Sequence, residues 1–330
     1  MTRVTVLIAV YNTEEYIRQC LDSLLSQTMS DWQAECVDDC SSDGSLAVLN
    51  EYAAKDSRFV VTHLDKNGGQ AHARNVGLRK AEGDIIAFLD SDDWLSDDAL
   101  QKTVETFDAN PRTGCVLFHC VKHYAGHDED YPMAEFNVMS GEEAFEKSLT
   151  WEIHGIYAVR RSIHDKYPYD ETLHAYGDDN VTRLHYIASQ EVRLCSGVYY
   201  YRQHASSVTH KVNIYRFDYL KANSIMKHCL ERMGVNRDLI VTYENCRWEN
   251  VVALCMFYYL HHGELPSADA RHGLQVIHKA WKSIDLSMLD DRSHYHRFGF
   301  LPLRFSWRLF RVQEKIYFFI RGLLGRNKEQ

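Results

Sequence analysis

Proline is scarce in this sequence, and long apolar runs are absent. Five of the 330 residues are proline and 45% are hydrophobic, which excludes collagen-like, low-complexity and globally disordered chains. No stretch reaches the roughly 18 uncharged apolar residues that a membrane-spanning helix needs. The first ten residues run directly into a strand-like segment, without the basic and apolar regions of a signal peptide. The nine cysteines lack a framework spacing, so we expect a cytoplasmic protein with reduced thiols.

Two glycine-rich phosphate-binding motifs are missing as well. The sequence contains neither Gly-x-x-x-x-Gly-Lys-Ser/Thr nor Gly-x-Gly-x-x-Gly, so we expect neither a P-loop nor a dinucleotide cofactor. The net charge of −9 disfavours non-specific nucleic-acid binding as the main function, and we expect no nucleic-acid partner. Charge is also uneven, because residues 292–330 hold nine Lys or Arg and two Glu. An acidic body is therefore followed by a basic C-terminal segment.

Strand and helix patterns alternate over the first 120 residues. Strand-like segments cover 4–10, 33–37, 59–62, 84–89 and 115–121, with helical patterns between them. This alternation predicts an α/β fold with an open, mainly parallel sheet flanked by helices. Further along the chain we expect helices at 141–149 and 179–188, a strand at 197–202, and mostly helix from about residue 215.

Polar side chains follow three of the predicted strands. They are Tyr11-Asn12, Asp38-Asp39 and Asp90-Ser91-Asp92. In open parallel sheets ligands bind beyond the carboxyl ends of the strands. We therefore expect these three strand ends to converge on one cleft.

The spacing of Asp90 and Asp92 suits a hard cation. Two carboxylates at a strand-to-loop transition can both address Mg²⁺ or Mn²⁺, which could bridge to a diphosphate and neutralise a leaving group. The alternative is a polar turn that caps the helix near Trp94. At the neighbouring strand end, one aspartate of Asp38-Asp39 could accept the imide proton of a uracil ring while Tyr11 packs against the base.

A further segment, outside the three strand ends, combines a glycine pair with a cation. Gly68-Gly69 offers a permissive turn, and Arg74 places a cation near phosphates. For the segment that follows Asp38-Asp39, turn and capping chemistry is the alternative, and we prefer it for Ser41 and Asp43.

Four sequence blocks carry a specific resemblance. They are Val4-Thr-Val-Leu-Ile-Ala-Val-Tyr-Asn12, Val37-Asp-Asp-Cys-Ser-Ser-Asp-Gly-Ser45, Asn67-Gly-Gly-Gln-Ala-His-Ala-Arg-Asn75 and Phe88-Leu-Asp-Ser-Asp-Asp-Trp94. In this order and at these distances they resemble the signature of family 2 glycosyltransferases, the inverting nucleotide-sugar enzymes with the GT-A fold. Two positions depart from the family pattern, Ala9 in place of the usual proline and Cys40 in place of the common glycine.

The resemblance implies a role for each matching residue. Tyr11 and Asp39 would hold the base with Asp38 beside them, Asp90 would contact the ribose or the metal, and Asp92 would ligate the metal. The implied donor-binding set is Ala9, Tyr11, Asp38, Asp39, Asn67, Gly68, Arg74, Asp90 and Ser91. The implied cofactor is Mn²⁺ or Mg²⁺, and the implied partners are a nucleotide-sugar, most simply a UDP-sugar, and a glycan or glycolipid acceptor.

Inverting transfer also needs a carboxylate that deprotonates the acceptor hydroxyl. Tyr176-Gly-Asp-Asp-Asn-Val-Thr182 lies at the start of a predicted helix, where similar enzymes carry a Glu-Asp pair. We expect Asp179 to be this base, with Asp178 as the second candidate. The alternative is that both carboxylates only stabilise the N-terminus of the helix.

The segment Tyr199 to His210 resembles the closing segment of the family. Arg202 and His204 would face the diphosphate, and His210 would complete the metal shell beside Asp90 and Asp92. Strand packing is the alternative for the tyrosines of this segment. On this basis we expect residues 1–212 to form the GT-A domain, with a nucleotide-binding half (1–120) and an acceptor half (121–212).

Residues 213–330 are expected to form a helical C-terminal region that ends in a basic amphipathic helix at about 301–325. Arg304, Arg308, Arg311 and Lys315 share one face of this helix, and apolar side chains cover much of the remainder. Such a helix suits the surface of an anionic membrane, so we expect peripheral association with the inner face of the cell membrane. The alternatives are packing on its own domain or on a second subunit, as in a homodimer.

The function that the sequence favours is a metal-dependent inverting glycosyltransferase of bacterial surface-polysaccharide synthesis. One alternative is a membrane-associated scaffold of the same fold that has lost activity. Another is a sugar nucleotidyltransferase, but the loop after the first strand, 11–15, is acidic and lacks glycine. Pyrophosphate exchange with UTP would distinguish this second alternative.

Overall fold

The protein is described here from a computed structural model, over residues 2–173, 175–204, 212–290 and 306–324. The chain divides into two compact units. The first comprises Met1–Thr172 and Gly177–Ser207, and the second comprises Leu173–Tyr176 and Val208–Gln330. Each unit is built around a hydrophobic core of its own.

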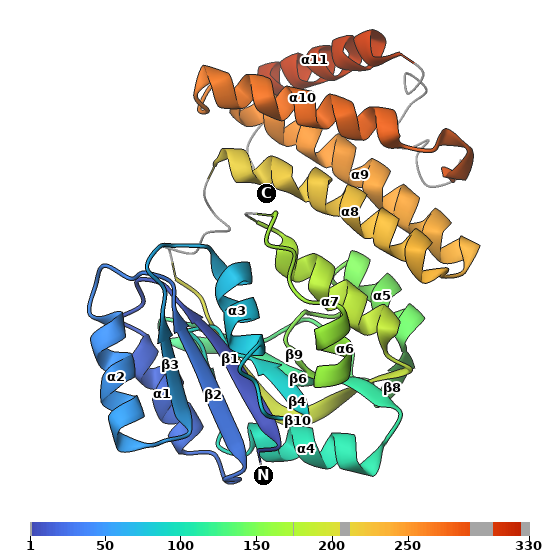
Figure 1. Cartoon of the computed structure of the whole chain (residues 1–330). Coiled ribbons are helices and arrows are strands. Elements are labelled where there is room, and N and C mark those ends of the chain that lie inside the picture. Colours follow the sequence, from blue (N-terminus) through green and yellow to red (C-terminus); the bar gives the residue numbers. More distant parts are fainter. Residues whose placement is uncertain (1, 174, 205–211, 291–305, 325–330) are drawn as a thin grey trace. The chain divides into compact units, whose positions relative to one another are not determined.

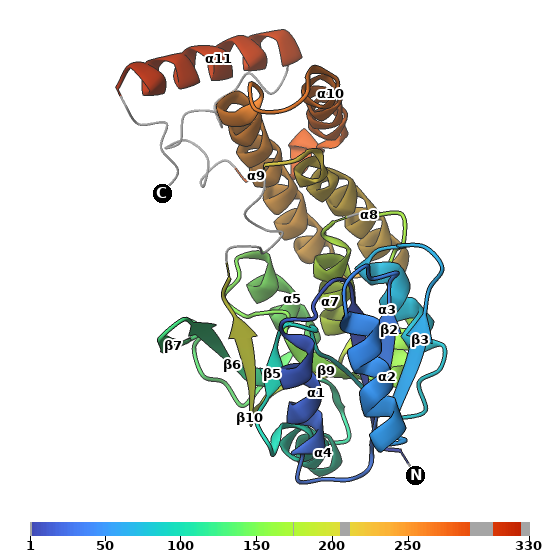
Figure 2. The same cartoon turned by 90° about the vertical axis from the view of Figure 1, so that its left-hand side faces the viewer.

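In the described residues, one ten-stranded mixed sheet forms the centre of the first unit (Figures 1 and 2). Its main order is β3-β2-β1-β4-β9-β6-β10-β5, with β7 paired to β6 and β8 to β10. The pairs β3–β2, β2–β1, β1–β4 and β6–β10 are parallel. The strands are β1 (Val4–Val10), β2 (Trp32–Asp38), β3 (Phe59–His63), β4 (Ile85–Phe88), β5 (Trp94–Leu95), β6 (Thr113–Tyr124), β7 (His127–Asp130), β8 (Val138–Ser140), β9 (Tyr157–Arg160) and β10 (Glu191–Arg202).

Helices cover both faces of this sheet. On one face, Val6 and Ile8 of β1 pack with α1, α2 and α4; on the other, Leu7 packs with α3, α5 and α7. The period of two in β1 and the 3.6-residue period of the helices explain this layering. The helices are α1 (Ile17–Leu25), α2 (Ser45–Lys55), α3 (Gln70–Leu78), α4 (Ala99–Ala109), α5 (Gly141–Leu149), α6 (Arg161–Lys166) and α7 (Gly177–Ala188).

The structure confirms the predicted α/β class and adds four strands that the sequence pattern did not indicate. These are β5, β7, β8 and β9, each of two to four residues. The strand β9 lies antiparallel between β4 and β6, so the sheet is parallel from β3 to β4 and mixed beyond. A segment of four residues is too short to show a reliable period, which is why the sequence did not reveal it.

The pairing of β1 with β4 requires a close backbone approach at Gly83, just before β4. A Cβ atom at this position would lie 2.6 Å from the backbone nitrogen of Thr5. We therefore expect Gly83→Ala to lower the free energy of unfolding by about 1–3 kcal/mol, the usual cost of overpacking. Chemical denaturation would measure it. Gly263→Ala is the control, because a Cβ there has no neighbour within 4 Å. Equal stabilities for the two variants would contradict the prediction.

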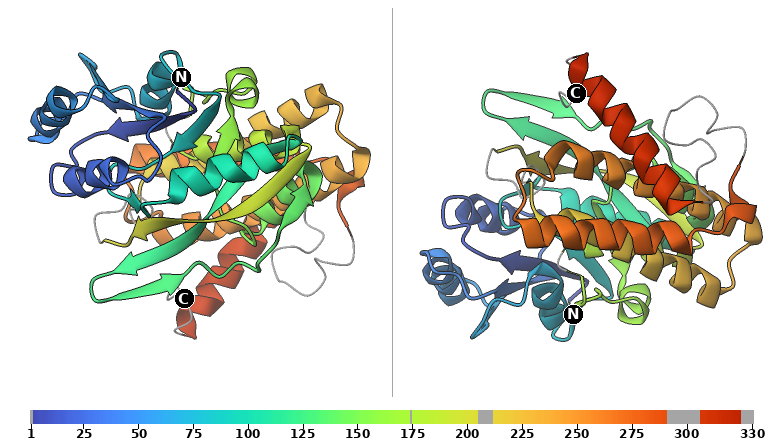
Figure 3. Two further views of the ribbon diagram at one scale, coloured as in Figure 1. Left: turned by 90° about the horizontal axis from the view of Figure 1, so that it is seen from below. Right: turned by 90° about the horizontal axis from the view of Figure 1, so that it is seen from above.

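The second unit is helical in its described residues. It consists of η2 (Ile214–Phe217), α8 (Asp218–Met233), α9 (Arg237–His261), α10 (Ser267–Ser283), η3 (Leu286–Met288) and α11 (Trp307–Leu323), seen from above in Figure 3. Its core includes Phe217, Trp248, Ile277 and Phe310. No described helix is long and apolar enough to cross a membrane.

Candidate active site

Three strand ends that carry the predicted polar groups lie at one edge of the sheet. The parallel register pairs Val10 of β1 with Asp38 of β2, and Leu7 of β1 with Phe88 of β4. Tyr11, Asp39 and Asp90 follow these strands within three residues. The expected convergence of the three strand ends is therefore present. The order β2–β1–β4 produces it, because parallel neighbours end on the same side.

Two loops are tied together beside the end of β1. The Asn12 side chain accepts from the Ser42 backbone N–H (2.8 Å), and the Asn12 N–H donates to the Ser41 hydroxyl (3.0 Å). Tyr11 is 51% exposed at this edge, and Ala9 is half-buried before it. A cavity of about 450 Å³ lies next to it, lined by Asn12, Glu14, Glu15, Tyr16 and Asp43. Ser41 and Asp43 therefore serve the turn, as preferred from the sequence.

Cys40 adopts a left-handed backbone conformation, with φ of 62°. A residue with a Cβ rarely occupies this region, whereas glycine does so readily. The departure from glycine at this position therefore places a strained residue directly after Asp38-Asp39.

Asp39 fixes the Gly68-Gly69 turn. Its two carboxylate oxygens accept from the backbone N–H groups of Gly68 and Gly69, each at 2.7 Å, and its carbonyl accepts from the Asn67 side chain at 3.2 Å. Asp38 is fully buried and contacts the His63 Nδ1 at 2.7 Å. The structure thus joins Asn67, Gly68 and Asp39 in one cluster, with Asp39 already bonded to backbone groups.

Arg74 connects the sheet edge to the loop before α7. It is buried and donates to Asp90 Oδ1 at 2.5 Å and to the Tyr169 hydroxyl at 3.0 Å. Partial desolvation raises the pKa of Asp90, and the charges of Asp92 and Asp178 add to the rise, while Arg74 opposes it. Tyr169 was not singled out from the sequence, since nothing local marks it as a neighbour of Arg74.

Asp92 lies beside the end of β10. Its Oδ2 is 2.9 Å from His204 Nε2, and its backbone carbonyl accepts from Arg202 Nε at 2.7 Å. The Arg202 guanidinium packs over Trp94 and Tyr16. Arg202 and His204 therefore both lie beside Asp92, and their role at a diphosphate stays a prediction. Ser91 is buried, and His210 lies outside the described residues.

Asp93 and Tyr199 hold β10 against this loop. Asp93 is buried; its carboxylate accepts from the Tyr199 hydroxyl (2.7 Å) and from the Arg202 backbone N–H (2.8 Å). Burial raises the pKa of Asp93 well above its usual value, and Asp90 and Asp92 add to the rise. Asp93 was not singled out from the sequence, although its place directly after Asp90-Ser91-Asp92 was a signal for a role.

Asp178 and Asp179 begin α7 but differ in surroundings. Asp178 is exposed, and its charge acts on both Asp90 and Arg74. The Asp179 side chain is 12% exposed and lies 4.0 Å from Arg183 Nη1. Burial raises the pKa of Asp179 to about 7, Asp178 adds to the rise, and Arg183 opposes it. A carboxyl with this pKa can exchange a proton near neutral pH.

The comparison with known proteins identifies the first unit. Residues 5–168 match the family described as Glycosyl transferase family 2. Residues 5–168, just under half of the chain, therefore form a glycosyl transferase family 2 domain. The four sequence blocks that gave the resemblance all lie within the matched residues or within one residue of them.

Two relatives and one solved structure illustrate the likeness. The chain is 33% identical over 219 residues to the putative glycosyltransferase EpsH of Bacillus subtilis, covering 63% of each protein. It is 42% identical over 102 residues to the putative teichuronic acid biosynthesis glycosyltransferase TuaG of the same organism, covering 31% of this chain and 40% of TuaG. The chain thus spans less than two thirds of each relative.

The S. aureus TarS 1-349 structure in complex with UDP-GlcNAc superposes with a TM-score of 0.77 at 17% identity. It covers 98% of this chain and 93% of the TarS chain. At this identity the likeness shows the fold alone, and it confirms the GT-A prediction together with the helical C-terminal region.

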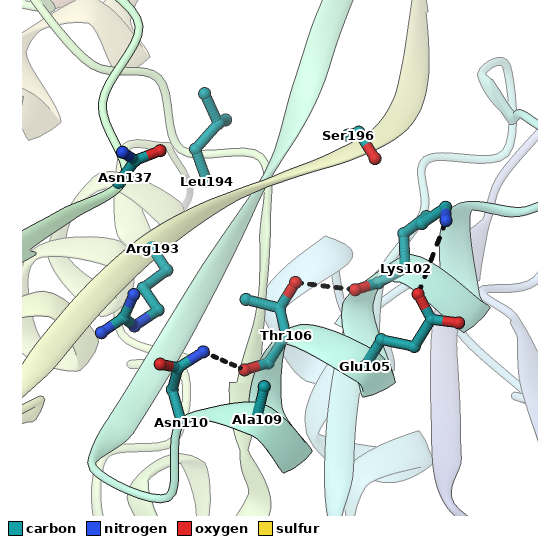
Figure 4. Close-up of a pocket in the computed structure, with 9 residues that line it drawn as sticks. All are labelled: Lys102, Glu105, Thr106, Ala109, Asn110, Asn137, Arg193, Leu194 and Ser196. Atoms are coloured by element: carbon teal, nitrogen blue, oxygen red, sulfur yellow. Dashed lines mark hydrogen bonds and ion pairs between the residues drawn. The ribbon is translucent and has the colours of Figure 1, made fainter.

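A second cavity of the first unit lies away from the candidate site residues. It measures about 580 Å³ between α4 and the first half of β10, and Figure 4 shows Lys102, Glu105 and Arg193 among its lining. Lys102 pairs with Glu105 at 3.5 Å across one turn of α4. No residue of the four family 2 blocks lines this cavity, so the candidate active site is the edge of the sheet that carries Asp39, Arg74, Asp90 and Asp92.

Proposed function

We propose that the protein is a metal-dependent inverting glycosyltransferase that uses a nucleotide-sugar donor, with UDP as the nucleotide. The observation that carries the proposal is the convergence of Asp39, Arg74, Asp90 and Asp92 at one strand edge of a family 2 domain. The TarS structure of the same fold contains UDP-GlcNAc, which supports this class of donor.

The base would bind where Tyr11 is exposed beside Asp39. The carboxylate of Asp39 holds the Gly68-Gly69 turn, and each of its oxygens keeps a second lone pair for the imide N–H of uracil. Arg74 and Arg202 supply fixed positive charge for the diphosphate, because both are held in place by aromatic rings.

The residues at the strand end fit a divalent cation. Asp90 uses Oδ1 for Arg74 and Gln70, and its Oδ2 makes no hydrogen bond to any described residue. Asp92 lies beside it with His204. No group of three or more acidic, His or Cys ligands is found among the described residues. Mg²⁺ and Mn²⁺ commonly take one or two carboxylates plus substrate phosphates, so Asp90 and Asp92 would hold the ion. Bound there, it would neutralise charge on the departing diphosphate.

The transfer would be a single displacement. The acceptor hydroxyl oxygen attacks the anomeric carbon as its proton passes to the carboxylate of Asp179, with Asp178 as the second candidate. The bond from the anomeric carbon to the diphosphate oxygen breaks, and its electron pair leaves with the nucleoside diphosphate. Arg202 and Arg74 stabilise that negative charge.

The acceptor that we propose is a glycan or a lipid-linked glycan of a bacterial surface polysaccharide. The support is the family of relatives, among them a protein named for teichuronic acid biosynthesis. The sugar of the donor and the linkage would be read from transfer assays with individual UDP-sugars.

Calorimetric titration with UDP tests the donor site. We expect Mn²⁺ to strengthen UDP binding, and Asp92→Ala to abolish this enhancement while the weaker metal-free binding persists. Asp165→Ala is the control, because Asp165 is an exposed carboxylate of α6 whose charge is paired with Arg161. Failure of the intact protein to bind UDP with Mn²⁺ would contradict a UDP donor and favour an inactive scaffold.

A further inference from the structure

The helix α11 has two apolar faces, and only one of them is packed. Phe310, Glu314 and Phe318 are buried at intervals of four residues. Phe310 contacts the ring of Trp248, and Phe318 stacks on Tyr259, both from α9 of the same unit. This face accounts for the docking of α11 on its own unit, one of the alternatives drawn from the sequence.

The other face of α11 exposes a continuous apolar stripe. Of the fifteen large hydrophobic side chains that are exposed in the described residues, seven lie between 309 and 324. The six on the helix are Leu309, Val312, Ile316, Phe319, Ile320 and Leu323, from 47% to 73% exposed. Their spacing of three or four residues places them on one side of the helix. An exposed apolar patch of this extent marks an interaction surface.

The charges around this stripe have one sign. Arg308, Arg311 and Lys315 are exposed beside it and form no ion pair with any residue in the described part of the chain. Glu314 is the one acidic residue of α11, and it is buried on the packed face. The exposed side of the helix therefore combines apolar side chains with positive charge only.

A second copy of the chain fits this surface less well. Leu309, Val312, Ile316, Phe319 and Leu323 follow a heptad spacing, which is typical of paired helices. The positions flanking such a seam would be Arg308 and Lys315 on one side, and Gln313 and Ile320 on the other. Neither parallel nor antiparallel pairing would bring an acidic residue opposite the two cations. An anionic surface is the complementary partner.

We propose that the exposed face of α11 binds the surface of a membrane containing anionic lipids, with the helix lying in the plane of the interface. Apolar side chains would enter the headgroup region while the basic residues contact anionic headgroups. The inference goes beyond the transferase activity and does not depend on it. If the acceptor is lipid-linked, this contact would keep the enzyme at the surface that carries its acceptor.

Cosedimentation of the full chain with vesicles tests the proposal. We expect binding to equal parts of phosphatidylcholine and phosphatidylglycerol, weak binding to phosphatidylcholine alone, and weakening by salt. A triple variant, Ile316→Ser with Phe319→Ser and Leu323→Ser, should lose binding. The control replaces three exposed apolar residues elsewhere, Val138→Ser, Met256→Ser and Leu286→Ser, and should bind like the unmodified chain.

A charge variant separates the electrostatic contribution. Replacing Arg308, Arg311 and Lys315 with Gln should weaken binding to the anionic vesicles on the order of 100-fold, and should leave the weak binding to phosphatidylcholine unchanged. Circular dichroism of each variant should match the unmodified chain, because all the replaced side chains are exposed.

Any of three results would overturn the proposal. The first is unchanged vesicle binding by the apolar triple variant, and the second is no binding by the intact chain. The third is a dimer in light scattering that the triple substitution dissociates, without any vesicle binding, which would assign the face to a second copy. Asp92→Ala should bind vesicles normally, so failure of the transferase proposal and failure of this one give different results.

Discussion

Replacing Asp179 with Asn should lower kcat/KM for sugar transfer roughly 10²- to 10⁴-fold, the usual contribution of a general base. The amide keeps the size of the side chain and cannot accept the acceptor proton. Initial rates with a UDP-sugar donor measure the effect, and the variant should bind UDP as tightly as the unmodified protein. Asp238→Asn is the control, because Asp238 is also an acidic residue in the first turn of a helix, α9.

The same proposal sets the pH dependence of the reaction. The pKa of Asp179 is raised to about 7, so its basic form is lost as the pH falls below that value. We expect log kcat/KM to fall by about one per pH unit below pH 7 and to level off above it. Because Asp178 helps to raise the pKa of Asp179, Asp178→Asn should move this limb to lower pH. Full activity of Asp179→Asn together with an inactive Asp178→Asn would make Asp178 the base.

Three buried histidines, His154, His164 and His185, should each disfavour the folded state increasingly as the pH falls from 6.5 to 4. Burial lowers the pKa of His154 and of His164 to about 4 and lowers that of His185 well below 6.5. The unfolded chain binds these protons below about pH 6.5, whereas the folded chain excludes them, so the contribution of these histidines to stability falls as the pH falls. Each imidazole would contribute up to about 1.4 kcal/mol of lost stability per pH unit.

A single variant isolates this effect in urea unfolding curves measured at several pH values. Below about pH 6.5, His164→Met should reduce the slope of the free energy of unfolding against pH, here called the acid limb, by up to one proton. The reason is that His164 is fully buried against Phe88 and Tyr169. His185 Nε2 keeps the Tyr167 carbonyl as partner in this variant. The control His127→Gln replaces an exposed histidine and should leave the limb unchanged. Parallel limbs for both variants would contradict the prediction.

The positions of the site loops could be predicted because they follow from local pattern and parallel pairing. Asp38, Asp90 and their neighbours end strands, and any parallel neighbours bring such ends together. The contacts that hold the side chains could not be predicted in the same way. Arg74 meets Tyr169, 95 residues away, and Asp93 meets Tyr199, 106 residues away, and no spacing in the sequence connects these pairs.

The C-terminal helix shows the same division. By itself, the sequence determined that the segment is helical, amphipathic and basic, because these properties depend on the order of residues along one helix. Only the tertiary structure decided which apolar side chains are used internally. It buries Phe310 and Phe318 against α9 and leaves Leu309, Ile316 and Phe319 exposed. Burial depends on neighbours that are distant in the chain, and a periodic pattern records only that a face is apolar, not what covers it.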